Sequence, residues 1–249
     1  MNNNIEPRRV ALVTGAAQRI GEQLVRALHA RGYNVILHYR SSADSASRIA
    51  GELNAQRRDS AHTVCAALED SAALRNLVGE SLSRWGRIDV LINNASSYYT
   101  TSWGEATLED WDNLIGSNLK GPFFLTQALL PVLSETRGCV VNMIDIFAER
   151  PARDFPVYCM AKAGLAMMTK SLAFDRGQKV RVNGIAPGVI LWPERPTSEA
   201  EKEETLERIP AGHIGNPDDI VRTALFLIED APYVNGQIIA VDGGLSLHT

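Results

Sequence analysis

The sequence has few cysteines, no clustered histidines and no long apolar run. Its three cysteines, Cys65, Cys139 and Cys159, lie far apart without a CxxC pair, so a disulfide framework is excluded and reduced thiols are expected. The five histidines show neither HxxxH spacing nor a Cys/His cluster, and we expect no metal site. No apolar run reaches the roughly 18 residues that a transmembrane helix needs, so we expect no membrane span.

A strong charge of one sign is also lacking. The formal net charge is −4 with both signs mixed along the chain, which gives no reason to expect nucleic acid or an anionic membrane as a partner. The first residues, MNNNIEPRRV, contain no apolar stretch of the signal-peptide type. We therefore expect a cytoplasmic protein.

Short apolar runs alternate with longer segments of helical period. The composition is 45% hydrophobic, enough for one sizeable core. The expected strands are 9–14, 34–39, 62–68, 88–95, 138–144, 180–187 and 236–244. The expected helices are 19–31, 43–56, 71–84, 107–130 (bent near Gly121-Pro122), 156–176 and 217–229, with a polar segment at 193–208. Because the strand runs are continuously apolar and need helical crossovers, they predict a mainly parallel sheet of seven strands. Without a linker or repeat, residues 1–249 are predicted to form one doubly wound α/β domain.

A glycine-rich turn, TGAAQRIG (14–21), joins the first strand to the first helix. Gly15 suits a tight turn, Gly21 lets the helix approach the sheet, and the helix N-terminus offers N–H groups to a pyrophosphate. Glycines can also merely end a strand, but the position at the first strand-to-helix turn favours nucleotide binding. Arg19 stands where such loops often have their middle glycine and adds a cation near the phosphates.

The second strand ends in HYRSS (38–42), without an acid to accept from a ribose 2′-hydroxyl. Arg40, Ser41 and Ser42 instead offer one charge and two hydroxyls that suit a 2′-phosphate. The alternative is that Arg40 is only a solvated loop residue. The pattern favours NADPH over NADH.

Asp145, Tyr158 and Lys162 combine an acid, a phenol and an amine. Asp145 follows the fifth predicted strand, on the edge of the sheet where doubly wound folds bind ligands. Tyr158 and Lys162 are four residues apart on the following helix and share a face, so the ammonium is expected to lower the pKa of the phenol for proton transfer. Such a pair is commonly just two surface side chains, but together with the nucleotide turn it predicts a catalytic site.

The motifs in their order resemble the short-chain dehydrogenase/reductases over essentially the whole chain. They are TG-x5-G at 15–21, NNA at 93–95, Asn118, Tyr158-x3-Lys162, PG at 187–188 and VDGG at 241–244. The resemblance implies a Rossmann-type fold and hydride transfer from a nicotinamide. It implies that Tyr158 donates a proton, Lys162 binds the nicotinamide ribose and Asn118 supports a proton relay.

Asp145 departs from the family's common pattern, in which a serine stands thirteen residues before the tyrosine. A carboxylate would repel the alkoxide that forms when a ketone is reduced, whereas an acid suits a ring nitrogen that needs a proton. TGAAQRIG, LHYR, NNASSYY, NMID and YCMAK together resemble the pteridine reductase branch, whose triad is Asp, Tyr and Lys. The resemblance implies that Ser96 touches the pterin and a cofactor phosphate, and that Tyr98 stacks on the pterin.

The motifs and the two resemblances together predict the following site residues. The catalytic residues are Asp145, Tyr158, Lys162 and Asn118. The cofactor-binding residues are Gly15, Arg19, Ile20, Gly21, Arg40, Ser41, Ser42, Leu68, Asn94, Ala95, Ser96, Tyr158, Lys162, Pro187 and Gly188. The substrate-binding residues are Arg19, Ser96, Tyr98, Asp145 and Tyr158.

Three features differ from the best-known pteridine reductases. Tyr98 replaces a phenylalanine, and Ala67 replaces the aspartate that often contacts adenine, so backbone groups of Leu68 are left for that contact. Residues 191–210 match the family's substrate loop only in position. Their polar, proline-flanked sequence predicts a mobile flap, with a plain solvated connection as the alternative.

The sequence thus predicts an NADPH-dependent reductase of dihydropterins, with dihydrofolate as a further candidate substrate. One alternative is a carbonyl reductase of the 3-oxoacyl or sugar type, against which Asp145 argues. Another is a cofactor-binding regulatory protein without activity, against which the intact Asp145, Tyr158, Lys162 and Asn118 argue. The resemblance also implies a homotetramer.

Overall fold

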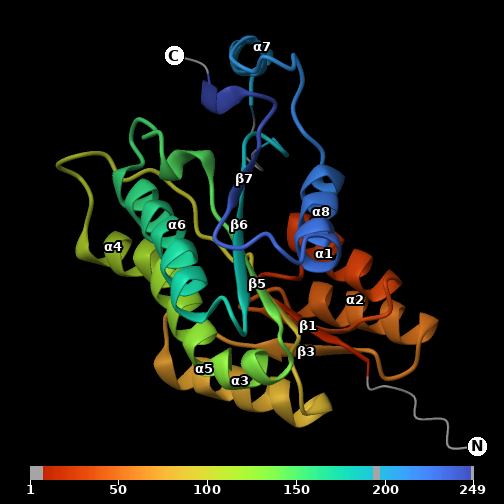
Figure 1. The fold of residues 1–249 in the computed structure, drawn as a ribbon. Coiled ribbons are helices and arrows are strands. Elements are labelled where there is room, and N and C mark those ends of the chain that lie inside the picture. Colours follow the sequence, from red (N-terminus) through yellow and green to blue (C-terminus); the bar gives the residue numbers. More distant parts are fainter. Residues whose placement is uncertain (1–7, 193–196, 248–249) are drawn as a thin grey trace, which may run out of the picture.

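The computed structural model describes residues 8–192 and 197–247, which form a seven-stranded parallel sheet with helices on both faces (Figure 1). The strand order is β3-β2-β1-β4-β5-β6-β7, and every neighbouring pair is parallel. The strands are β1 Val10–Val13, β2 Asn34–Tyr39, β3 Ala61–Cys65, β4 Val90–Asn93, β5 Cys139–Met143, β6 Arg181–Pro187 and β7 Ile238–Val241. The order reverses direction at β1, so the fold is the predicted doubly wound α/β domain.

Two helical layers cover the sheet. One contains α1 (Arg19–Ala30), α2 (Ala43–Gln56) and α8 (Pro217–Leu225); the other contains α3 (Ser71–Trp85), α5 (Gly121–Glu135) and α6 (Pro156–Arg176), with α4 (Leu108–Ile115) packed against α6 (Figure 1). A separate apolar core fills each side of the sheet. β1 and β4 are buried along their whole length, which explains why their sequences are continuously apolar rather than alternating.

The predicted bent helix over 107–130 is three consecutive helical pieces. Between α4 and α5 lies a π-helical turn, η1 (Gly116–Lys120), and α5 continues to Glu135. Pro122 lies just after this turn, and because η1 and α5 are continuous, its missing N–H removes one helical hydrogen bond there. The wider turn thus lies where the proline interrupts the α-helical pattern, and it carries Asn118.

The polar segment predicted at 193–208 contains a helix, α7 (Glu199–Glu207). Ser198 and Glu201 form a capping box that fixes its start, although α7 buries no residue. Residues 193–196 of the segment lie outside the described residues. The predicted helix over 217–229 is α8 followed directly by a π-helical turn, η3 (Phe226–Asp230). The last strand ends earlier than predicted, since β7 stops before Gly243 and Gly244, which have left-handed φ angles of 62° and 86°.

None of the helices in the described ranges is long and apolar enough to cross a membrane.

Candidate active site

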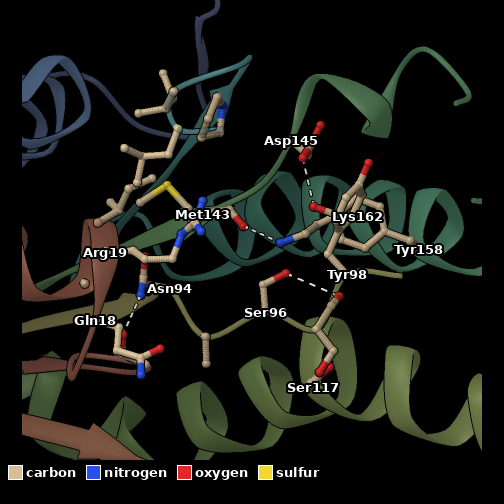
Figure 2. Close-up of a pocket in the computed structure, with 18 of the residues that line it drawn as sticks. Gln18, Arg19, Asn94, Ser96, Tyr98, Ser117, Met143, Asp145, Tyr158 and Lys162 are labelled. Atoms are coloured by element: carbon tan, nitrogen blue, oxygen red, sulfur yellow. Dashed lines mark hydrogen bonds between the residues drawn. The ribbon is translucent and has the colours of Figure 1, made fainter. Parts of the chain in front are cut away.

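A cavity of about 720 Å³ runs along the carboxyl ends of the strands, from the glycine turn to Asp145 (Figure 2). Of the predicted site residues, it is lined by Gly15, Arg19, Ile20, Gly21, Arg40, Ser41, Ser42, Leu68, Asn94, Ala95, Ser96, Tyr98, Asp145, Tyr158, Lys162, Pro187 and Gly188. The parallel topology brings these residues together because each follows the end of a strand or lies on the next helix. Asn118 is the exception: it is fully buried beside the cavity rather than on its surface.

The glycine turn leaves no room for side chains. A Cβ at Gly15, whose φ is +62°, would lie 2.9 Å from Cα of Ala95, and one at Gly21 would lie 2.1 Å from the carbonyl oxygen of Gly15. Arg19 has a left-handed φ of 51°, a conformation that favours glycine, as its position in the motif predicts. The close approach of this bare backbone to the N-terminus of α1 fits a pyrophosphate.

Besides the glycine turn, the carboxyl ends of β2 and β3 line the part of the cavity that fits a nucleotide. Arg40 is exposed, with Nη1 3.7 Å from Oε1 of Glu69, and Ser42 Oγ accepts a hydrogen bond of 3.1 Å from Gln18. Leu68 is 5% exposed and lines the cavity, while Ala67 does not. The set therefore fits a dinucleotide that lies across the sheet with its adenosine end at β2 and β3. Which residues contact the cofactor remains a prediction.

Asp145 and Tyr158 form a hydrogen-bonded pair at the other end of the cavity (Figure 2). The Tyr158 hydroxyl donates to Oδ2 of Asp145 at 2.8 Å, and the Phe147 amide donates to Oδ1 at 2.9 Å. Burial raises the pKa of Asp145 above its ordinary range. The carboxyl group is thus fixed in place by a short 3-10 turn, η2 (Ile146–Ala148), and is poised to hold a proton.

The pKa of Tyr158 is raised well above 10, first by burial and then by the Asp145 carboxylate. The expected lowering by Lys162 is wrong for this structure. The Lys162 ammonium lies 5.5 Å from the centre of the Tyr158 ring and donates to the carbonyl oxygen of Met143 at 2.9 Å (Figure 2). Burial also lowers the pKa of Lys162 to about 8.

Asn118 contacts the site through Ser96 rather than directly. Ser96 Oγ donates to Oδ1 of Asn118 at 2.7 Å, and Nδ2 of Asn118 lies 2.9 Å from the Ser97 carbonyl oxygen and 3.0 Å from that of Leu114. The amide group therefore fastens the loop after β4 to the π-helical turn η1. This loop also carries Tyr98, so the hydrogen bonds of Asn118 help to fix the position of the Tyr98 ring.

Tyr98 stacks on Phe155, with ring centres 4.5 Å apart and planes 6° apart, and meets the Tyr158 ring edge-on at 4.9 Å. It is 53% exposed and lines the cavity beside the Asp145–Tyr158 pair. The sequence reasoning did not single out Phe155. A signal was present, since Phe155 directly precedes the helix that carries Tyr158.

Several other lining residues were also missed. Among them are His38, Phe147 and Trp192, together with Thr197, Glu201, Glu204, Thr205 and Arg208 from α7 and its flanks. The α7 residues lie within the predicted substrate loop, 191–210, although no residue in it was assigned a role. Within the described ranges, no three His, Cys, Asp or Glu side chains gather as a metal site would require.

Comparisons with known proteins agree with this geometry. Residues 15–246 match the family model described as enoyl-(acyl carrier protein) reductase. The chain is 35% identical to pteridine reductase 1 of Leishmania tarentolae, over 96% of each protein. It is 33% identical to a 3-oxoacyl-(acyl-carrier-protein) reductase of Staphylococcus aureus, over 94% of this chain and 97% of that one.

A third relative is a (2S)-((R)-hydroxy(phenyl)methyl)succinyl-CoA dehydrogenase subunit of Thauera aromatica, 36% identical over 96% of this chain and 97% of that one. The three named activities differ, but each relative matches the chain over nearly its whole length, and the reductases of the matched family use NADH or NADPH. The chain belongs to the short-chain dehydrogenase/reductase family.

Proposed function

We propose that this oxidoreductase reduces pterins with NADPH, converting dihydrobiopterin or dihydromonapterin, and also dihydrofolate, to the tetrahydro forms. The observation that carries the proposal is the hydrogen bond of 2.8 Å from Tyr158 to Asp145. A carboxyl group with a raised pKa suits the protonation of a ring nitrogen and is unsuited to stabilising an alkoxide. The likeness to a pteridine reductase supports the same substrate class.

The reaction adds two hydrogens across a carbon–nitrogen double bond of the pyrazine ring. The bound nicotinamide cofactor supplies hydride to the ring carbon. The Asp145–Tyr158 pair supplies a proton to the neighbouring nitrogen, directly or through water, and regains it from solvent. The exposed face of Tyr98 holds the flat ring by stacking, with its other face kept in place by Phe155.

The cofactor half of the proposal assigns NADPH to the cavity. Gly15, Arg19, Ile20 and Gly21 would hold the pyrophosphate, and Arg40, Ser41 and Ser42 would bind the 2′-phosphate. Leu68 would contact the adenine. Asn94, Ala95, Ser96, Pro187 and Gly188 would line the nicotinamide half, where Lys162 would hold the ribose.

The proposed alternative activity is reduction of a 3-oxoacyl or sugar carbonyl, favoured by the likeness to the 3-oxoacyl reductase. Purified enzyme is tested for oxidation of NADPH with 7,8-dihydrobiopterin and, separately, with an acetoacetyl thioester. We expect turnover of the pterin and little of the thioester. Turnover of the thioester alone would overturn the pterin assignment.

We further propose a homotetramer located in the cytoplasm. Large apolar side chains are exposed on one helical layer of the single chain, among them Phe123 and Phe124 on α5 and Met167 and Phe174 on α6. Cys65, Cys139 and Cys159 are all free thiols, as in a reducing compartment.

A further inference from the structure

His38 lies at the end of β2, beside the glycine turn, and its imidazole is 2% exposed. The Gly15 amide donates to Nδ1 at 3.2 Å. Nε2 lies 3.0 Å from the carbonyl oxygen of Ala66, which can only accept, so Nε2 carries the proton and Nδ1 is the acceptor. Both ring nitrogens are therefore used within the protein.

The same residue also holds the next amide of the turn. The Ala16 N–H donates to the backbone carbonyl oxygen of His38 at 2.8 Å. From the β4 side, the amides of Asn94 and Ala95 donate to the Thr14 hydroxyl at 2.9 and 3.0 Å. The glycine turn is thus fixed from two neighbouring strands, with His38 on the β2 side.

We infer that His38 is a positioning residue for the nucleotide, which sets the glycine turn in the conformation that binds the pyrophosphate and does not itself recognise the 2′-phosphate. The inference rests on the cofactor of the family and extends the proposed use of NADPH. It gives different roles to His38 and Arg40, the first and third residues of the sequence HYR (38–40). His38 acts on the part that NAD and NADP share, and Arg40 acts on the phosphate that distinguishes them.

The charge state of the imidazole agrees with this assignment. Burial lowers the pKa of His38 to about 4, against smaller opposite effects of the Ala66 carbonyl and of Glu69, so the ring is neutral at pH 7. Arg40 is exposed at the cavity, so its guanidinium can reach a phosphate there. The neutral imidazole contributes hydrogen bonds only.

The test compares the affinity for NADP⁺ and for NAD⁺, measured by calorimetry, across a set of variants. His38→Leu leaves the partly buried Gly15 amide without its acceptor, and we expect both affinities to fall by a similar factor of roughly ten. His38→Asn places an oxygen near the position of Nδ1 and should recover most of this loss. Arg40→Ala should lower the affinity for NADP⁺ alone.

His62→Leu is the matched control, since His62 is a partly buried histidine on the neighbouring strand, β3, outside the cavity lining. It should leave both affinities unchanged. A loss confined to NADP⁺ in His38→Leu, or unchanged binding of both nucleotides by folded His38→Leu, would overturn the inference. Equal binding of NAD⁺ and NADP⁺ by the wild-type protein and by Arg40→Ala would instead overturn the proposed NADPH preference and leave the role of His38 standing.

A second measurement needs no variant. Long-range ¹H–¹⁵N spectra of the histidine rings should show His38 neutral and protonated at Nε2 at pH 7, with the same pattern in the NAD⁺ and NADP⁺ complexes. A charged His38 ring that forms only with NADP⁺ would mean that the imidazole binds the 2′-phosphate, against the inference.

Discussion

At the scale of single residues, Asp145 determines what the Tyr158 hydroxyl can do. The phenol donates its proton toward the carboxylate, and burial of both groups raises both pKa values. A serine in the place of Asp145 could relay a proton but has no comparably acidic proton of its own to supply. The pair is therefore better suited to deliver a proton than a lone tyrosine with so high a pKa.

The substitution Asp145→Asn tests this role. Asparagine keeps the acceptor for the Phe147 amide but cannot supply a proton, so we expect kcat for dihydrobiopterin to fall roughly 10²-fold to 10³-fold with nucleotide affinity unchanged. Because the protonated carboxyl is the active form, wild-type kcat should fall as pH rises through the raised pKa of Asp145, and the variant should lose this pH dependence.

Asp112→Asn, at an exposed position of α4, is the matched control and should keep wild-type kinetics. Full pterin turnover by Asp145→Asn, with an unchanged pH profile, would remove the carboxyl group from proton delivery.

At the scale of elements, two helices with the same start signal are held in different ways. Both α4 and α7 begin with a capping box, Thr107 with Asp110 and Ser198 with Glu201. α4 also buries Leu114 and packs against α6, whereas α7 buries no side chain. The stability of α7 therefore depends mainly on its own hydrogen bonds, which is the condition that the flap predicted for 191–210 requires.

Removing each cap separates local from global stability. A lost cap costs about 1 kcal/mol. Ser198→Ala should speed amide hydrogen exchange in α7 about fivefold and leave Tm unchanged, because α7 can unfold without the core. Thr107→Ala should lower Tm by roughly 2–4 °C, because α4 unfolds with the core.

Hydrogen exchange by mass spectrometry and calorimetry measure the two effects. An equal drop of Tm in both variants would show that α7 is part of the cooperative core, and the flap proposed for 191–210 would then be wrong.

At the scale of the whole molecule, the sequence determines the fold through its buried strands. Continuous apolar runs such as VALV (β1) and VLI in β4 need cover on both faces, and the topology then brings every strand end to one edge. This is why Gly15, Asp145 and Tyr158 could be placed together without a structure. Hydrogen bonds between residues far apart in the sequence leave no periodic pattern in it. The contacts of His38 with Gly15 and Ala66 could therefore not be predicted.

α7 was missed for a related reason. A helix that buries nothing has no apolar period to detect, and its capping box is the only local signal. The Tyr98–Phe155 stack joins residues of two different loops, and its ring planes depend on packing that periodicity does not describe.

The proposed tetramer places the exposed apolar side chains of α5 and α6 in an interface between subunits. Met167 and Phe174 are seven residues apart on α6, so they share one face, and they are 63% and 92% exposed in the single chain. An exposed surface of this kind on a globular chain marks an interaction site. Met167→Glu would bury a charge there, and we expect it to convert tetramers into dimers in sedimentation velocity.

The nucleotide cavity is lined by no residue of this patch, so Met167→Glu should bind NADP⁺ as the wild type does. Gln56→Glu, at the exposed end of α2 in the opposite layer, adds the same charge and should leave the tetramer intact. If Met167→Glu stays tetrameric while it remains folded and binds nucleotide, the α6 face is not part of the interface. The apolar patch would then have to serve another contact, since water alone does not favour so much exposed hydrocarbon on one face.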